Sequence, residues 1–412
     1  MNDNAAGTIR ETVAEDRERA VAFLAELVRT PTDNPPGDLA PAAERIASLL
    51  EELGFEVERH PVPTERVHAV GMTSCTNLVV RRRFAKAGPR IALNAHGDVV
   101  PPGAGWSVDP YAAEIRDGWM YGRGVAVSKS DIASYAFAMR ALEPLAADLA
   151  GGVELHVTFD EETGGEIGPR WLLEQGIVRP DLALCAGFSW QVVDAHNGCL
   201  HLEVTVRGRS AHAALPGTGI DALEAATAAL AALYEQRHAL AREVSKVPGI
   251  GSPQLTVGLI EGGINTNVVP DRVAFRLDRR LIPEERGEEV EAALAALIRE
   301  AVAKVPGATV EIRRVLLAEP LRPLPGGERL AASLTRHARA VLGEPVPTGG
   351  VPLYTDARHY AAAGVPVVLY GAGPRSIEEA NAHRADERLP LDILPKATEV
   401  VARAVADLLW RN

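Results

Sequence analysis

Residues 91–101 are Ile91-Ala-Leu-Asn-Ala-His96-Gly-Asp98-Val-Val-Pro101, an apolar run that ends in a histidine, a glycine and an aspartate. A short apolar run bounded by turn residues is typical of a buried β-strand. Ligand sites of open α/β sheets gather at the carboxyl ends of such strands. Because His96 and Asp98 point to one side of an extended chain, the carboxylate can hold the imidazole tautomer that leaves the other nitrogen free for a metal. A surface His–Asp pair without function is the alternative.

A second predicted strand ends in two adjacent carboxylates, in the stretch Phe159-Asp-Glu161-Glu162-Thr-Gly-Gly165. Adjacent side chains cannot both face one way, so one glutamate can bind a metal while the other takes a proton from a water. A solvated acidic loop that caps the next helix is the alternative.

A third candidate is His383, which follows Gly371-Ala-Gly-Pro374 late in the chain. A lone late histidine is usually structural, so His383 gains weight only beside the other two sites.

Short β-rich runs alternate with helical stretches through most of the chain. We expect strands at 91–95, 153–159 and 182–186, helices at 131–149 and 169–175, and two opening helices at 9–29 and 41–53. This alternation predicts an α/β fold with a mixed, largely parallel sheet flanked by helices.

A different pattern starts near Cys199 and predicts a ferredoxin-like βαββαβ unit. Its expected elements are a strand to residue 206, a helix at 220–242, strands at 254–260 and 273–281, a helix at 285–305 and a strand at 308–315. The α/β pattern then returns, with a helix at 328–342, a strand at 365–370 and a closing helix at 395–409. We therefore predict a discontinuous catalytic domain, 1–197 and 317–412, that carries an inserted lid and dimerisation domain, 198–316.

Composition excludes several classes of protein. The 412 residues include 47% hydrophobic and 24% charged side chains, as in ordinary globular proteins. A net charge of -12 disfavours nucleic acid as a partner, and no apolar run is long enough to span a membrane. The polar start of the chain lacks a secretory signal, so we expect a cytoplasmic protein. Cys75, Cys185 and Cys199 are widely spaced, which predicts buried, reduced thiols without disulfides or a thiolate zinc site.

Motifs spread along nearly the whole chain resemble one known family. The sequence is similar to the metal-dependent family that contains aminoacylase, acetylornithine deacetylase, succinyl-diaminopimelate desuccinylase and the glutamate carboxypeptidases. The resemblance rests on the residues 96–101, 106, 109–110, 121–124, 160–165, 208–212, 262–270, 278–283, 355–358 and 383, which occur in the family's order.

The resemblance implies a site with two metal ions, but two of its ligands are absent. The family's bridging aspartate corresponds to Val127, in Gly122-Arg-Gly-Val-Ala-Val127-Ser128-Lys129. A second carboxylate should lie about ten residues before His196, where the chain has Ala186 and no acid. Neither valine nor alanine can coordinate a metal.

The remaining residues suffice for one ion. By resemblance His96, Glu162 and His383 are ligands, Glu161 is the general base and Asp98 orients His96. Two imidazoles and a carboxylate can hold one divalent ion, zinc, manganese or iron, with an open coordination position. We therefore expect a mononuclear site rather than a binuclear one. A degenerate pseudoenzyme is the alternative.

Other polar residues near the missing positions are second-choice ligands. They are Ser128, Asp131, Asp194 and His196. We expect Asp131 to be the N-cap of the following helix and His196 to enter the next strand. Lys129 corresponds to the family's lysine, and a purely structural role is the alternative interpretation of this residue.

The inserted domain supplies further residues by resemblance. It implies that His212 reaches a partner subunit's active site and stabilises the oxyanion, and that Asn267, Arg280 and Arg358 hold the substrate carboxylate. A polar residue at a strand–helix turn is the alternative for His212. The resemblance also implies a homodimer.

These residues predict a metal-dependent hydrolase of the amide C–N bond in an N-acyl amino acid, dipeptide or related small carboxylate. Glu161 would take the proton of the attacking water and pass it to the leaving amine. Two alternatives stay open. One is an aminohydrolase that releases ammonia from an activated aromatic amine, and the other is a non-catalytic binding protein on the same fold.

Overall fold

A computed structural model describes residues 1–411 and contains two compact units. The first unit comprises Met1–Asp194, Pro323–Gly349 and the chain from Thr355 on, and the second comprises Ala195–Arg322 and Gly350–Tyr354. Among the described residues, every helix is too short or too polar to cross a bilayer.

The first unit is built on an eight-stranded sheet with the order β1-β2-β6-β3-β7-β14-β8-β13. These strands are β1 (Val57–Pro61), β2 (Thr76–Arg83), β3 (Lys86–His96), β6 (Ala150–Thr158), β7 (Leu182–Cys185), β8 (Val192–His196), β13 (Thr348–Val351) and β14 (Val367–Leu369). The central neighbours β6, β3, β7 and β14 are parallel, so the predicted mixed, largely parallel sheet is confirmed. Three short strands, β4 (Glu114–Arg116), β5 (Trp119–Tyr121) and β15 (Arg388–Pro390), form a separate sheet.

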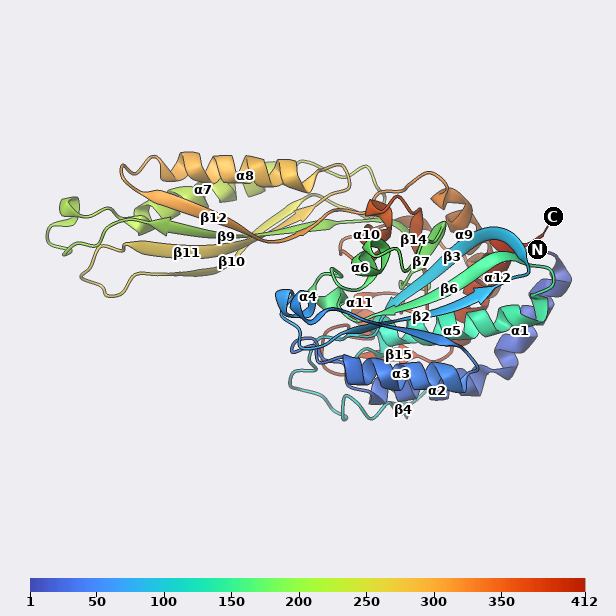
Figure 1. Cartoon of the computed structure of the whole chain (residues 1–412). Helices are drawn as coiled ribbons and strands as arrows, with labels where there is room; N and C mark the ends of the chain where they lie inside the picture. Colours follow the sequence, from blue (N-terminus) through green and yellow to red (C-terminus); the bar gives the residue numbers. More distant parts are fainter. Residues whose placement is uncertain (412) are drawn as a thin grey trace. The chain divides into compact units, whose positions relative to one another are not determined.

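Helices cover both faces of the large sheet. They are α1 (Asp3–Glu15), α2 (Arg17–Arg29), α3 (Ala40–Glu52), α4 (Thr64–Ala69), α5 (Ser130–Leu142), α6 (Pro169–Glu174), α9 (Gly327–Leu342), α10 (Ala357–Ala362), α11 (Ile377–Ala380) and α12 (Ile393–Leu409). In Figure 1 α5 and α1 lie on one side of the sheet and α6 and α10 on the other. Strands covered on both faces are apolar along their length, and Ile91 to His96 of β3 are all buried.

Two predicted helices have different limits from those expected. The helix expected at 9–29 is wrong, because Asp16 divides it into α1 and α2. The Asp16 carboxylate accepts hydrogen bonds from Arg19 (2.9 Å) and Arg140 (2.8 Å), which anchor the break. The helix expected at 131–149 ends at Leu142, because Pro144 cannot donate the next backbone hydrogen bond.

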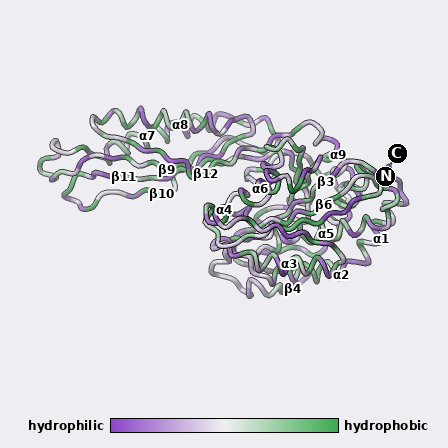
Figure 2. Tube along the Cα trace, in the orientation of Figure 1, coloured by the Kyte–Doolittle hydropathy of each residue, from purple (hydrophilic) through white to green (hydrophobic). Residues whose placement is uncertain are grey.

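The second unit has the element order β9-α7-β10-β11-α8-β12 around a four-stranded antiparallel sheet, β10-β11-β9-β12. The elements are β9 (Gly198–Arg207), α7 (Ala222–Leu240), β10 (Gln254–Gly262), β11 (Arg272–Leu281), α8 (Gly287–Val302) and β12 (Thr309–Ala318). Hydrophobic and hydrophilic residues alternate along α8 (Figure 2). Its apolar side packs with α7 against Leu200, Leu202 and Val204 of β9. The intervening residues of β9 therefore face the side of the sheet without helices.

Candidate active site

His96 is the last residue of β3 and is buried. Its Nδ1 lies 3.0 Å from the main-chain oxygen of Asp98 and 3.4 Å from Asp98 Oδ1. The Ser128 hydroxyl accepts from the His96 amide (3.0 Å) and donates to the His96 carbonyl (2.9 Å). These contacts use Nδ1 and fix the backbone, so Nε2 is the nitrogen available for a metal ion.

The fully buried Asp98 carboxylate connects two strand ends. Its Oδ2 accepts hydrogen bonds from the Glu162 amide (3.1 Å) and the Asn34 side-chain amide (3.1 Å), and its Oδ1 accepts one from the Glu161 amide (3.3 Å). Asp98 therefore fixes the position of the two glutamates relative to His96.

Glu161 and Glu162 begin a short helical turn, Glu161–Thr163, just after β6. Since β6 and β3 are parallel neighbours, this turn and His96 lie at the same edge of the sheet. One nitrogen of His96 and one carboxylate oxygen of each glutamate all lie within 4.8 Å of one another. The chain thus brings an imidazole and two carboxylates together at the place predicted for a metal ion.

The electrostatics of this cluster favour a bound cation. Burial raises the pKa of the Glu161 carboxyl to about 8, and the Glu162 and Asp98 carboxylates add to the rise. Burial lowers the pKa of His96, but Asp98 and both glutamates raise it more, so that it lies well above its usual value. Burial of several carboxyl groups around one imidazole disfavours their simultaneous ionisation, and a divalent ion would supply the positive charge that lets them ionise together.

His383 joins the cluster through Glu162. It lies in the loop after α11 with a positive φ of 61°, and its Nε2 is 3.3 Å from Glu162 Oε1. The side chain is 54% exposed, in contrast to His96 at 8%. The contact with Glu162 raises the pKa of His383. His383 thus borders the cluster from its open side.

The positions of the two missing ligands carry apolar side chains. Val127 precedes Ser128, the residue that holds the His96 backbone. Ala186 follows β7, and its amide donates to the Asn94 carbonyl at 2.8 Å. In residues 1–411 two groups of three possible ligands converge closely, and neither includes a replacement at these positions.

The second-choice ligands have other contacts. The prediction that Asp131 is the N-cap of α5 is wrong, because α5 begins at Ser130 and Asp131 lies inside its first turn. The Asp131 carboxylate instead accepts a hydrogen bond from the Ala372 amide at 2.7 Å. His196 Nδ1 lies 2.9 Å from the Asn197 carbonyl. Asp194 is a half-buried residue of β8, and burial raises the pKa of its carboxyl. Lys129 is buried and donates to the Thr30 carbonyl at 2.8 Å, and burial lowers its pKa to about 7.

The three predicted substrate-binding residues and the predicted oxyanion donor His212 are distributed over both units. In the first unit, buried Arg358 donates to the Gly164 carbonyl, next to the turn that bears the glutamates, and its charge opposes the rise in the pKa of Glu161. In the second unit, exposed His212 and Asn267 belong to adjoining loops, since the Ala213 amide donates to the Asn267 carbonyl at 3.0 Å. Arg280 of β11 donates to Asp278.

One ion pair that supports the site, between Glu387 and Arg123, is not predicted by any pattern in the sequence. Glu387 is buried and pairs with Arg123 at 2.6 Å, and it accepts hydrogen bonds from the amides of Ala126 (3.1 Å) and Val127 (3.3 Å). The two ends of this contact are 264 residues apart. Glu387 thus holds the segment that runs beside His96.

We expect Glu387→Gln to lower the free energy of unfolding by about 3–5 kcal/mol, because it leaves the buried Arg123 guanidinium without a counter-charge. Urea unfolding followed by circular dichroism measures the change. The control is Glu26→Gln, which breaks ion pairs of half-exposed side chains and should cost less than about 1 kcal/mol. Equal losses in both variants would contradict a structural role for Glu387.

We expect Asp98→Asn to weaken metal binding about 10–100-fold. The new side-chain NH2 group would point at some of the three N–H groups that donate to the Asp98 carboxylate, those of Asn34, Glu161 and Glu162. The imidazole of His96 would then no longer be held in one orientation. Isothermal titration with zinc or cobalt measures the affinity. Asp181→Asn is the control, since Asp181 is exposed and accepts from the Arg90 amide outside the cluster. Unchanged affinity in Asp98→Asn would show that Asp98 does not position the metal ligands.

Comparison with known proteins identifies the family of this chain. The model of peptidase family M20/M25/M40 matches residues 92–407. The chain belongs to this family. It is 30% identical over 401 residues to succinyl-diaminopimelate desuccinylase of Acidiphilium cryptum, covering 95% of this chain and 98% of the other. It is 29% identical over 388 residues to acetylornithine deacetylase of Myxococcus xanthus, covering 93% and 96%.

Solved structures show the same fold. An M20 family metallo-carboxypeptidase from Sulfolobus solfataricus superposes with a TM-score of 0.75 at 18% identity, covering 95% of this chain and 98% of the other. The family resemblance inferred from the motifs is therefore confirmed, and with it the assignment of this protein as a metal-dependent hydrolase of the M20 family.

Proposed function

We propose that this M20 protein hydrolyses the amide C–N bond of an N-acyl amino acid, a dipeptide or a related small carboxylate, with one metal ion held by His96, Glu162 and His383. The observation that carries the proposal is the convergence of His96, Glu161 and Glu162, bordered by His383. The side chains of Val127 and Ala186, where the family resemblance implies further ligands, have no donor atom.

The donor set fits one divalent ion. Two imidazole nitrogens and a carboxylate are ligands that zinc, manganese and iron all accept, and they leave a coordination position open. When bound, such an ion supplies Lewis acidity, which polarises the amide carbonyl and makes a water a stronger nucleophile at neutral pH.

Glu161 is the proposed general base. It neighbours the proposed ligand Glu162, and the Asp98 carboxylate holds its backbone amide. A carboxylate at this position can accept the proton of the attacking water and deliver it to the leaving amine. Burial raises the pKa of the Glu161 carboxyl, and a bound divalent ion would oppose this rise, which leaves the carboxylate form available to accept a proton.

The substrate carboxylate would meet cationic and amide side chains. Arg358 lies at the glycine turn after the glutamates, and we propose that it acts with Asn267 and Arg280 in this role, with His212 as the oxyanion donor. The relatives named a desuccinylase and an acetylornithine deacetylase support acylated amino acids as substrates.

A second copy of the chain completes the proposal. In the second unit β10 is an edge strand, and Leu259 (61% exposed) and Ile260 (57% exposed) lie on it. Such an edge favours pairing with another strand. A mass of one chain in light scattering would contradict the dimer.

The test is a panel of N-succinyl, N-acetyl and dipeptide substrates incubated with the metal-loaded protein, with both the acid and the free amine quantified. Equal amounts of acid and amine support amide hydrolysis, and their loss in Glu161→Gln assigns the activity to this site. Ammonia released from an aromatic amine without an acid product would instead indicate an aminohydrolase. If no substrate of the panel is turned over, either by the wild-type protein or by Glu161→Gln, the non-catalytic binding protein is the remaining alternative.

A further inference from the structure

The second unit contains a cluster of possible metal ligands on the face of its sheet without helices. Along β9, Cys199 and His201 are two residues apart and lie on the face opposite to Leu200 and Leu202. On β11, Asp278 is the direct cross-strand partner of His201. Directly opposed residues of antiparallel strands have their Cβ atoms about 5 Å apart, so strand register alone brings these side chains together.

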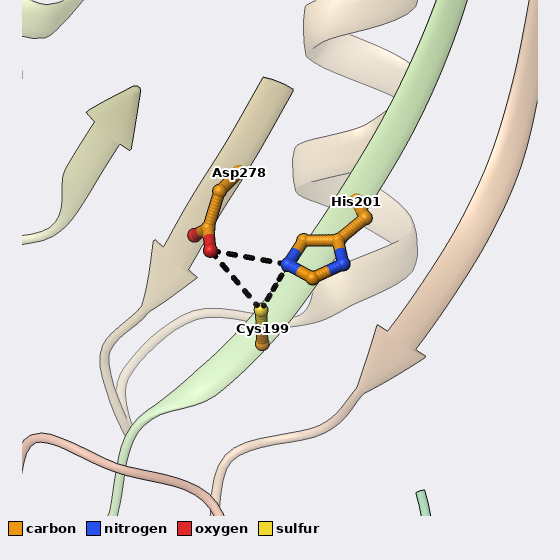
Figure 3. Close-up of side chains that lie close together, drawn as sticks. All are labelled: Cys199, His201 and Asp278. Carbon is orange, nitrogen blue, oxygen red and sulfur yellow. Dashed lines mark hydrogen bonds and ion pairs between the residues drawn. The ribbon is translucent and has the colours of Figure 1, made fainter. Parts of the chain in front are cut away.

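The three donor atoms converge on one point (Figure 3). His201 Nε2 lies 3.1 Å from Asp278 Oδ2 and 3.2 Å from Cys199 Sγ, and Sγ lies 3.9 Å from the same carboxylate oxygen. Zinc bound tetrahedrally, at about 2.3 Å to sulfur and 2.0–2.1 Å to nitrogen or oxygen, separates its ligand atoms by roughly 3.3–3.6 Å. Each observed separation is within a few tenths of an ångström of that range.

The direction of the imidazole separates a metal site from a nucleophilic triad. In a Cys–His–Asp triad the nucleophile and the carboxylate contact different ring nitrogens. Here the same nitrogen, Nε2, faces both Cys199 and Asp278, and the other ring nitrogen points away from them (Figure 3). One proton on Nε2 cannot bridge both partners well, whereas one cation among the three donors can.

The residues around the three donor atoms also suit a metal site. Cys199 is buried, whereas the side chains of His201 (37% exposed) and Asp278 (31% exposed) are open to solvent. Arg280 donates to both Asp278 oxygens, at 3.0 and 3.1 Å, and such outer hydrogen bonds orient metal-binding carboxylates. A thiolate, an imidazole and a carboxylate form a mixed set that suits zinc better than a hard cation such as magnesium or calcium.

We propose that Cys199, His201 and Asp278 bind one zinc-class divalent ion in the second unit. This site shares no residue with the His96–Glu162–His383 centre, and the proposal does not depend on the reaction of that centre.

The test uses cobalt as a spectroscopic probe of the full-length, metal-stripped protein. Thiolate-bound cobalt gives an intense near-ultraviolet charge-transfer band, and the His96 centre offers only nitrogen and oxygen donors. We expect the band to saturate at one cobalt per chain, to disappear when zinc is added in excess, and to persist in Glu162→Ala.

Variants assign the band to its ligands. Cys199→Ser should abolish it, and Asp278→Asn should weaken the cobalt affinity about 10-fold or more. Cys185→Ser is the matched control, a buried thiol at the end of β7, and should leave the band unchanged; circular dichroism checks that each variant is folded. No band in the wild-type protein, a band that survives Cys199→Ser, or one that is lost in Cys185→Ser would each overturn the proposal.

Discussion

Glu161→Gln lowers kcat by about 10³-fold on the best substrate, within the 10²–10⁴-fold range of a general base. The substitution keeps the shape of the side chain and its backbone contact with Asp98, and removes only the group that accepts the proton. Because Glu162, not Glu161, is the proposed ligand, we expect the metal content of the variant to equal that of the wild type. Steady-state kinetics and elemental analysis of one preparation measure both quantities.

The control for this prediction is Glu166→Gln. Glu166 follows the same turn but forms an exposed ion pair with Arg170, so kcat should change less than about 2-fold. A loss of metal in proportion to the loss of kcat in Glu161→Gln would show that Glu161 is a ligand and that the roles of the two glutamates are exchanged.

Glu162→Ala weakens metal binding by more than about 100-fold and abolishes turnover. It removes the one carboxylate of the proposed ligand set, which is also the ion-pair partner of His383, and leaves two imidazoles as the remaining proposed ligands. Equilibrium dialysis against zinc or cobalt in the Cys199→Ser background, which lacks the proposed thiolate site, followed by elemental analysis, measures the affinity.

Glu166→Ala serves as the matched control for Glu162→Ala, because it deletes a carboxylate four residues away and outside the cluster. If Glu162→Ala bound metal as tightly as this control, Glu162 would not be a ligand, and the assignment of the adjacent pair would have to be revised.

The local elements of the fold could be predicted from the sequence. The apolar runs at 91–95, 153–159 and 182–186 overlap with β3, β6 and β7, because strands covered on both faces are continuously apolar. His96 and Glu161 follow two of these strands, and parallel neighbours necessarily end at the same edge. The pattern of apolar runs therefore predicts that both residues lie at strand ends, and the pairing of β3 with β6 brings them close together.

Contacts between distant segments could not be predicted. Asn34 reaches Asp98, and Glu387 reaches Arg123, from positions 64 and 264 residues away, and no local pattern marks such pairs. The three-residue strands β4, β5 and β15 are too short to show a period. An aspartate near the start of a helix is expected to cap it, and this expectation rests on residue type alone. In the structure the buried Asp131 carboxylate accepts a hydrogen bond from the distant Ala372 amide instead.

The cysteines illustrate the same limit. Their wide spacing predicts buried thiols without a zinc site, and all three are buried and free of disulfides. The spacing along one chain segment carries no information on the neighbouring strand, however, and the Asp278 carboxylate meets Cys199 and His201 only through the register of β9 and β11.

The measurement that tests the one-ion active site most directly is the metal-to-chain stoichiometry of the Cys199→Ser variant. This background removes the proposed thiolate site, so that only the His96 centre is counted. After saturation and desalting we expect one ion per chain, and none when Glu162→Ala or His383→Ala is added. Two ions per chain in Cys199→Ser, or one ion that survives both additional substitutions, would contradict the mononuclear centre.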